Sequence, residues 1–273
     1  MKRSLLCFAF FFCLINCFSQ NGMYNIWYFG ERAGLDFNTN PPTATSNSAM
    51  VQQEGCATIC DNTGHLLFYS DGTSVWNRNH QVMPNGNGLR GGFSASQSVL
   101  VVPSPGNNNV YYIFTVPEEF INAPLCYSII DMTLDAGLGD ITAIKNVPLH
   151  TPVQEKLTAT LKSNGVDYWV IAKEAGSDAF LVYSLTSAGV DPNPVISHIG
   201  FSLGSQDKLG YVRVSPNGLK LCIAYTRNSL SQLFDFDNIT GILSNPIDLT
   251  TSLLPFGPYG IEFSPDNSKL YIM

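Results

Sequence analysis

The stretch Ser215-Pro-Asn-Gly-Leu-Lys-Leu-Cys-Ile-Ala224 contains a polar turn followed by an apolar run. Similar stretches begin at four other positions, with 43 to 59 residues between successive starts: Asp61, Ser104, Ser163 and Ser264. Asn, Asp and Gly tolerate positive φ and therefore suit tight turns between antiparallel strands. A short apolar run next to such a turn is typical of a buried strand. The chain thus repeats a turn-and-strand unit along most of its length.

Further strands fit into each period. The pattern predicts strands at 156–161, 168–172, 180–185 and 195–199, and in the next period at 210–214, 219–225, 232–236 and 247–249. Four-stranded units that recur every ~40 to 60 residues are typical of β-propeller blades. A β-sandwich is the alternative, but it does not explain a recurring turn at this spacing. We therefore expect an all-β fold, a β-propeller of four-stranded antiparallel blades.

The last repeat is shorter than the others. Lys269-Leu-Tyr-Ile-Met273 ends the sequence soon after the fifth turn. About five blades are expected, with the last one truncated and carrying an unpaired apolar edge, which is an aggregation hazard. We therefore expect the chain to be a fragment of a longer protein that carries further domains.

The N-terminus has the pattern of a secretory signal. Lys2 and Arg3 precede an apolar run from Leu5 to Phe18, and small residues follow. The run is shorter than the ~20 residues that span a bilayer. We expect residues 1–20 to be a signal peptide that is cut after Ser19 or Gln20, which leaves 21–273 as the propeller domain. An uncleaved anchor and a lipoprotein modified at Cys17 are the alternatives.

Composition excludes several classes of protein. The chain has 45% hydrophobic and 13% charged residues, and 14 basic against 21 acidic side chains give a net charge of −7. Loss of Lys2 and Arg3 with the signal makes this −9. An acidic chain lacks the basic footprint of a nucleic-acid-binding protein. No second apolar stretch approaches membrane length, so no membrane span is expected after cleavage.

Four cysteines remain after signal cleavage: Cys56, Cys60, Cys126 and Cys222. An even number in an exported chain permits disulfides, so their state stays open. Each lies in an apolar strand pattern, which favours buried free thiols. Zinc sites need paired Cys or His at short spacing, and a single Cys-x3-Cys pattern is weak. We expect neither a metal nor a cofactor.

Five stretches resemble a known family: residues 27–37, 54–72, 75–86, 96–103 and 111–115. They include Trp27-Tyr-Phe-Gly-Glu-Arg-Ala-Gly-Leu-Asp-Phe37. Together they look like the N-terminal β-propeller, with WD40-like or YVTN-like repeats, of large exported proteins of gliding bacteria. In that family a gliding-motility-associated or type IX secretion sorting domain usually follows at the C-terminus. The resemblance implies a secreted or cell-surface location and no particular activity.

Trp76, Arg78 and His80 are the candidate binding residues. They alternate in the sequence, so a continuous strand would place them on one face. An aromatic ring beside a planar cation and an imidazole suits an anionic or sugar ligand. The alternative is that Trp76 packs between blades while the other two are solvated.

Three other patterns favour structure over chemistry. Gly200-Phe-Ser-Leu-Gly204 matches a nucleophile elbow, but every histidine precedes it, so a loop between blades is expected. The stretch 235–241 loosely resembles a calcium loop, yet Pro246 takes the place of the required acid, which favours a hairpin turn. Glu118 and Glu119 follow Pro117 and would point apart if extended.

The favoured function is a non-enzymatic, exported β-propeller that binds protein or glycan at the cell surface as part of a larger gliding or type IX secretion-associated protein. A propeller enzyme is the alternative, either a polysaccharide hydrolase or lyase or a quinoprotein-like dehydrogenase. A purely structural spacer is a third hypothesis. Three or more acids and histidines converging on the central channel would favour the enzyme.

Overall fold

The computed structural model describes residues 22–119, 121–204, 208–250 and 257–273. The expected signal peptide, residues 1–20, lies outside these ranges. The described chain forms six antiparallel sheets, which follow one another in sequence order. Three short 3-10 helices accompany the strands: η1 (Gly22–Tyr24), η2 (Asp135–Gly137) and η3 (Thr226–Asn228).

The sheets differ in size. Sheet one has three strands, β1 (Ile26–Phe29), β2 (Ala33–Asp36) and β3 (Thr43–Thr45). Sheet two has β4 (Ala57–Cys60), β5 (Leu66–Ser70), β6 (Ser74–Asn77) and β7 (Val82–Asn87). Sheet three has β8 (Val99–Ser104), β9 (Asn107–Thr115), β10 (Leu125–Asp131), β11 (Asp140–Ile141) and β12 (Val147–His150), and both β11 and β12 pair with β10.

The second half of the chain continues this pattern. Sheet four has β13 (Val153–Leu161), β14 (Tyr168–Glu174), β15 (Ala179–Thr186), β16 (Gly189–Val190) and β17 (Val195–His198), the last two pairing with β15. Sheet five has β18 (Val212–Val214), β19 (Lys220–Tyr225), β20 (Leu230–Asp237) and β21 (Ile242–Thr250). In the described residues, sheet six has β22 (Ile261–Phe263) and β23 (Leu270–Ile272).

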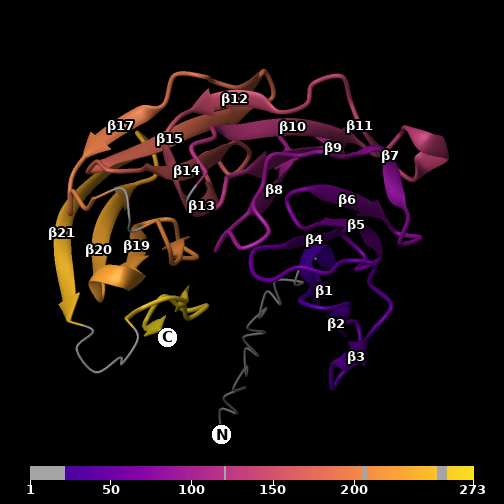
Figure 1. The fold of residues 1–273 in the computed structure, drawn as a ribbon, viewed down its shortest axis with the longest axis horizontal. Coiled ribbons are helices and arrows are strands. Elements are labelled where there is room, and N and C mark those ends of the chain that lie inside the picture. The colour runs from indigo at the N-terminus through magenta and orange to yellow at the C-terminus, as the bar shows by residue number, and fades with distance from the viewer. Residues whose placement is uncertain (1–21, 120, 205–207, 251–256) are drawn as a thin grey trace, which may run out of the picture.

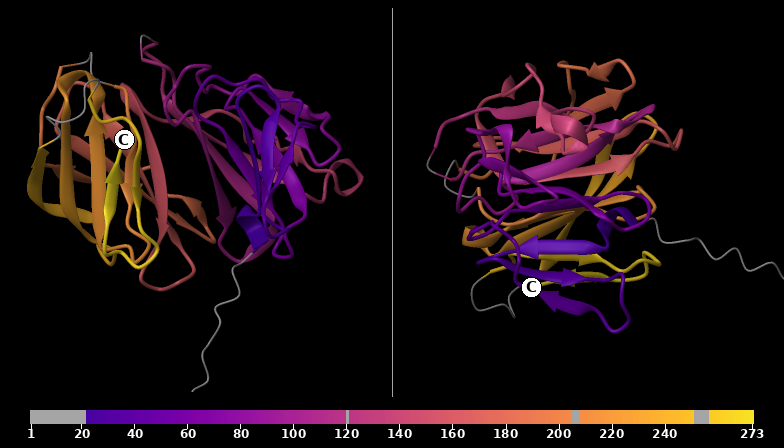
Figure 2. Two further views of the ribbon diagram at one scale, coloured as in Figure 1. Left: turned by 90° about the horizontal axis from the view of Figure 1, so that it is seen from below. Right: turned by 90° about the vertical axis from the view of Figure 1, so that its right-hand side faces the viewer.

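The sheets stand around a common centre. The first strand of each sheet packs beside the first strand of the next, from β1 through β4, β8, β13 and β18 to β22. Figure 1 shows the resulting ring, and Figure 2 shows the sheets stacked face to face when the ring is seen from its sides. The chain is a β-propeller.

Apolar side chains fill the space between neighbouring sheets. Five buried clusters lie between the five successive pairs of sheets. Middle strands such as β14 and β15 are buried along runs of five residues, because each of their faces packs on another sheet. This explains why the sequence shows continuous apolar runs instead of strict alternation.

The recurring turn has one structural role. In sheets two to six it joins the first strand to the second, at residues 61–65, 105–106, 162–167, 215–219 and 264–269. All five turns therefore lie at the ends of the inner strands, and we call this the turn end of the ring. The copies at Ser215 and Ser264 are the most alike: each Ser Oγ accepts a hydrogen bond from the backbone N–H five residues later, at 2.9 Å.

The expected β-propeller fold is confirmed, and the structure adds sheet one, which precedes the first recurring turn. Sheet one is not marked by the recurring phrase, because its first connection is Gly30-Glu-Arg32. All eight strands that were predicted between residues 156 and 249 are present, and β16 is an additional short strand. No helix in the described part of the chain is long and apolar enough to cross a membrane.

Candidate functional site

The segment that leads into β8 contacts strands that lie far along the chain. Ser96 and Gln97 are buried just before the strand begins. The Gln97 carboxamide accepts hydrogen bonds from the backbone N–H of Val212 at 2.8 Å and of Leu157 at 3.3 Å. Its amide group donates to the Val212 carbonyl at 3.2 Å. One side chain thus fastens the inner strands of sheets three, four and five together.

Ser96 belongs to a hydrogen-bonded polar network that crosses the centre of the ring. The Tyr259 hydroxyl donates to Glu54 Oε2 at 2.6 Å and lies 3.0 Å from Ser96 Oγ. Both the N–H and the hydroxyl of Ser96 donate to Glu155 Oε2, at 2.7 and 3.0 Å. The Gly210 N–H donates to Ser96 Oγ at 3.1 Å. Two carboxyl groups from different sheets are therefore connected through two hydroxyls.

The hydrogen bonds of this polar network depend on the protonation of its carboxyl groups. Two hydroxyl protons serve three oxygen–oxygen contacts, so every contact holds a proton only when a carboxyl group is also protonated. Burial raises the pKa of Glu155 most, and the charge of Glu54 raises it further, whereas hydrogen bonds from Ser96 and the Glu119 backbone oppose the rise. Glu155 is therefore the carboxyl best suited to hold the extra proton. Burial also raises the pKa of Tyr259, which keeps its hydroxyl protonated.

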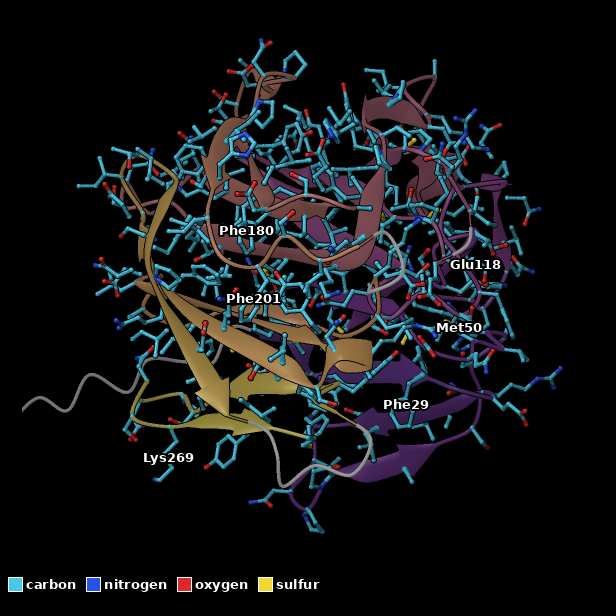
Figure 3. The ribbon with its side chains drawn as sticks, turned by 60° about the vertical axis from the view of Figure 1, so that its left-hand side comes forward. Phe29, Met50, Glu118, Phe180, Phe201 and Lys269 are labelled. Carbon is cyan, nitrogen blue, oxygen red and sulfur yellow. The ribbon has the colours of Figure 1, made fainter. Side chains whose placement is uncertain are left out.

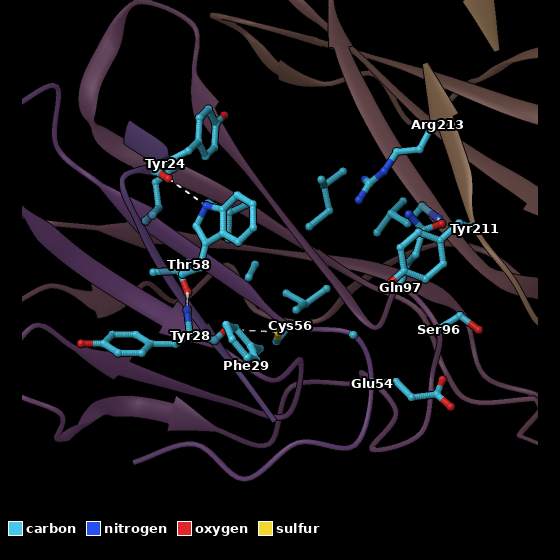
Figure 4. Close-up of a pocket in the computed structure, with 18 residues that line it drawn as sticks. Tyr24, Tyr28, Phe29, Glu54, Cys56, Thr58, Ser96, Gln97, Tyr211 and Arg213 are labelled. Atoms are coloured by element: carbon cyan, nitrogen blue, oxygen red, sulfur yellow. Dashed lines mark hydrogen bonds between the residues drawn. The ribbon is translucent and has the colours of Figure 1, made fainter. Parts of the chain in front are cut away.

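An aromatic cavity of about 540 Å³ opens beside this polar network and is lined by residues of the inner strands. Figure 4 shows Tyr24 and Phe29 on one side of it and Tyr211 and Arg213 on the other. Trp27, which also lines it, is 52% exposed and donates from its indole N–H to the Tyr24 carbonyl at 2.9 Å. The Arg213 guanidinium lies 5.4 Å from the Tyr211 ring centre. Aromatic faces thus stand next to polar groups that form hydrogen bonds.

A second, acidic cavity of about 370 Å³ lies where the inner strands begin. Four glutamates line it together with three other residues: Glu54, Glu118, Glu119, Glu155, Ser94, Ile121 and Leu209. Glu118 is labelled in Figure 3. Glu54 lines both cavities, so the two adjoin. We call this side of the ring the acidic end; it is opposite the turn end.

The structure does not place the predicted trio on one strand face. Strand β6 ends at Asn77, and Arg78 and His80 lie in the following turn, where His80 has a φ of 60°. Trp76 stacks on Tyr69, with ring centres 5.4 Å apart, between sheets one and two. The ring nitrogens of His80 lie 3.1 Å from the Tyr69 hydroxyl and 3.1 Å from the Asn47 amide nitrogen. Arg78 is exposed, and Trp76 and His80 are half-buried.

Burial lowers the pKa of His80, so its imidazole is less readily protonated than an exposed one. A neutral ring bonded to Tyr69 and Asn47 is engaged in the packing of sheets one and two. The role of Trp76, Arg78 and His80 in binding therefore stays a prediction, and neither cavity is lined by any of them.

Other sequence motifs have structural roles. The stretch Gly200–Gly204 is a loop between β17 and β18, and the stretch at 235–241 covers the end of β20 and the turn 238–241 that leads to β21, as expected for a hairpin. Glu118 and Glu119 are the exception: they do not continue a strand, and both line the acidic cavity. The expectation that they point apart applied to an extended chain and was wrong here.

The four cysteines of the described chain are free thiols. Cys60, Cys126 and Cys222 are buried as expected, and Cys56 is half-buried. Burial raises the pKa of Cys56 and Cys60 to about 11 and that of Cys222 to about 12, so these thiols are poor nucleophiles. Within the described residues, no group of three His, Cys, Asp or Glu side chains could hold a metal ion.

Comparison with known proteins supports the fold. No protein-family model and no curated protein matches the chain. Among solved structures, a candidate 6-phosphogluconolactonase from Bacteroides fragilis is 10% identical, with a TM-score of 0.54 over 90% of this chain and 72% of that one. Hsv2 from Kluyveromyces lactis is 11% identical, with a TM-score of 0.49 over 93% of this chain and 69% of its own. At this identity, the likeness to the Bacteroides protein concerns the fold alone.

Proposed function

We propose that the protein is a non-enzymatic binding module that takes a glycan or protein ligand in the aromatic cavity. The observation that carries the proposal is the cavity itself, which is lined by exposed Trp27 and Phe29 and by Tyr211 and Arg213. Figure 4 shows Phe29 across the cavity from Tyr211 and Arg213. Aromatic faces pack on the apolar faces of sugars and peptides, while a guanidinium and a carboxylate bind polar groups. The rigid ring holds these groups in place before a ligand arrives, which reduces the entropy lost on binding.

The proposed setting is the cell surface or the extracellular space. The signal-like residues 1–20 and the resemblance to exported propellers of gliding bacteria support this part of the proposal. N-terminal sequencing of the protein expressed with its own leader tests export. A mature chain that starts directly after Ser19 or Gln20 supports the proposal, and retention of the leader contradicts it.

Ligand screening tests the binding role. Glycan and envelope-protein arrays are probed with the wild-type protein and with Trp27→Ala, which we expect to weaken binding about tenfold, since a buried aromatic contact contributes strongly to affinity. Tyr271→Ala is the matched control, because Tyr271 is also 52% exposed but lies on β23, outside the cavity. Equal loss in both variants, or no loss in either, would contradict binding in this cavity.

A polysaccharide hydrolase or lyase is the second candidate. The observation that favours it is that Glu54 and Glu155 meet through Tyr259 and Ser96 while burial raises the pKa of Glu155, as a general acid requires. The described residues that line the two cavities include no histidine. Release of reducing ends from polysaccharides, abolished by both Glu54→Gln and Glu155→Gln, would establish this function in place of simple binding.

A further inference from the structure

The acidic cavity has acceptor atoms that the protein itself leaves without partners. Each of its glutamates is held through one oxygen, Oε2, by a donor of the chain: Glu54 by Tyr259, Glu118 by Ser94, Glu119 by Arg227 and Glu155 by Ser96. Glu155 is fully buried and Glu119 is 7% exposed. The Oε1 atoms of both are buried and have no hydrogen-bond partner. Buried acceptors of this kind are rare and point to a ligand that donates to them.

We propose that the acidic cavity binds the primary ammonium group of an organic cation. An ammonium group has three N–H donors and a positive charge, so it can serve the free oxygens of Glu119 and Glu155 and approach Glu118 as well. The positive charge of the ammonium group favours the ionised form of Glu155, so this carboxyl group gives up its proton when the cation binds. Carboxyl groups that are fixed in a partly closed cavity need little rearrangement to receive the cation.

The geometry disfavours the smaller cations. No three acidic side chains in the described chain come together closely enough to coordinate a metal ion. Glu119 is already paired with Arg227, so one of the four carboxyl groups is compensated by the chain itself. A cavity of about 370 Å³ has room for an alkyl chain behind the ammonium group, as in a free diamine or a lysine side chain.

Calorimetric titration of the folded protein with 1,5-diaminopentane at low ionic strength tests the proposal. We expect saturable binding, and about tenfold or greater weakening in Glu155→Gln and in Glu118→Gln, because a charge-assisted hydrogen bond is lost in each. A carboxamide keeps one oxygen for the Ser96 or Ser94 donor, so both variants should fold. Glu31→Gln is the matched control, since Glu31 is exposed and lines neither cavity.

Three further titrations sharpen the result. 1,5-Pentanediol has the same length without the charge and should not bind, and CaCl2 should not displace the diamine. N-acetyl-lysine amide separates the two sources: tighter binding than the diamine identifies a lysine side chain of a partner, and weaker binding identifies a free amine. Absence of diamine binding to the folded wild-type protein, equal binding of the diol, displacement by calcium, or unchanged affinity in both glutamine variants would overturn the proposal. Trp27→Ala leaves this site intact, so its outcome is independent of binding in the aromatic cavity.

Discussion

The two ends of the ring are built in different ways. At the turn end, the Ser215 and Ser264 hydroxyls each bind a backbone group five residues away, and the Asn217 N–H donates to Asn267 Oδ1 in the neighbouring turn, 50 residues away. At the acidic end, Ser96 contacts groups 59, 114 and 163 residues distant, and Tyr259 reaches Glu54 across 205 residues. Repetition in the sequence therefore marks the turn end, whereas the acidic cavity lies at the end where the sequence does not repeat.

The largest expected effect comes from Gln97. Gln97→Leu leaves the buried N–H groups of Val212 and Leu157 without acceptors, which should lower the free energy of unfolding by about 3 kcal/mol. Asn217→Ala, an exposed change at the turn end, removes the acceptor of the Ser215 hydroxyl and the Leu219 N–H and should lower it by only about 1 kcal/mol. Urea denaturation of both variants measures the difference. Equal losses would show that the two ends contribute alike.

A second effect concerns the contact between sheets two and six. Tyr259→Phe removes the hydrogen bond to the Glu54 carboxylate and should lower the free energy of unfolding by about 1.5 kcal/mol, since Tyr259 is half-buried. A double-mutant cycle with Glu54→Gln should show coupling between the two positions. Tyr271→Phe is the control at an exposed position. Additive losses in the cycle would argue against the contact.

The pH dependence of stability provides a third test. Because burial raises the pKa of Glu155 above its unfolded value, the folded protein holds this proton more tightly than the unfolded chain. The wild-type protein should therefore lose this contribution as the pH rises from the unfolded pKa through the folded one. Glu155→Gln should lack that decline, so its stability relative to wild type increases with pH. Parallel curves for both proteins between pH 4 and 8 would contradict a raised pKa.

The smallest effect compares two copies of the repeated turn. Ser215→Ala and Ser264→Ala each remove an acceptor for one backbone N–H, and each should lower the free energy of unfolding by about 1 kcal/mol. Since the bonds have the same length, the two losses should agree within about 0.5 kcal/mol. Thermal denaturation of the two variants checks this. A large difference would mean that the two similar turns contribute unequally to the free energy of unfolding.

The sequence predicted the fold well and the site poorly, for physical reasons. Tight turns depend on a few neighbouring residues, so Ser-Pro-Asn-Gly next to an apolar run identified the strands of the later sheets. Glu54 precedes sheet two, Glu118 follows β9 in sheet three and Glu155 lies on β13 of sheet four, so their convergence depends on how the inner strands align in space. The expected placement of Trp76, Arg78 and His80 on one strand face assumed a strand that reaches residue 80, whereas β6 ends at Asn77, so their role in binding stays a prediction.

The long reach of Ser96 and Tyr259 has a consequence for biosynthesis. The residues that line the acidic cavity, from Glu54 to Leu209, emerge from the ribosome before Tyr259, which fixes Glu54. The cavity therefore gains its final shape only after sheet six has docked on the ring. A ligand of that cavity would distinguish the finished protein from its folding intermediates, and by binding only the former it would draw newly made chains toward the assembled ring.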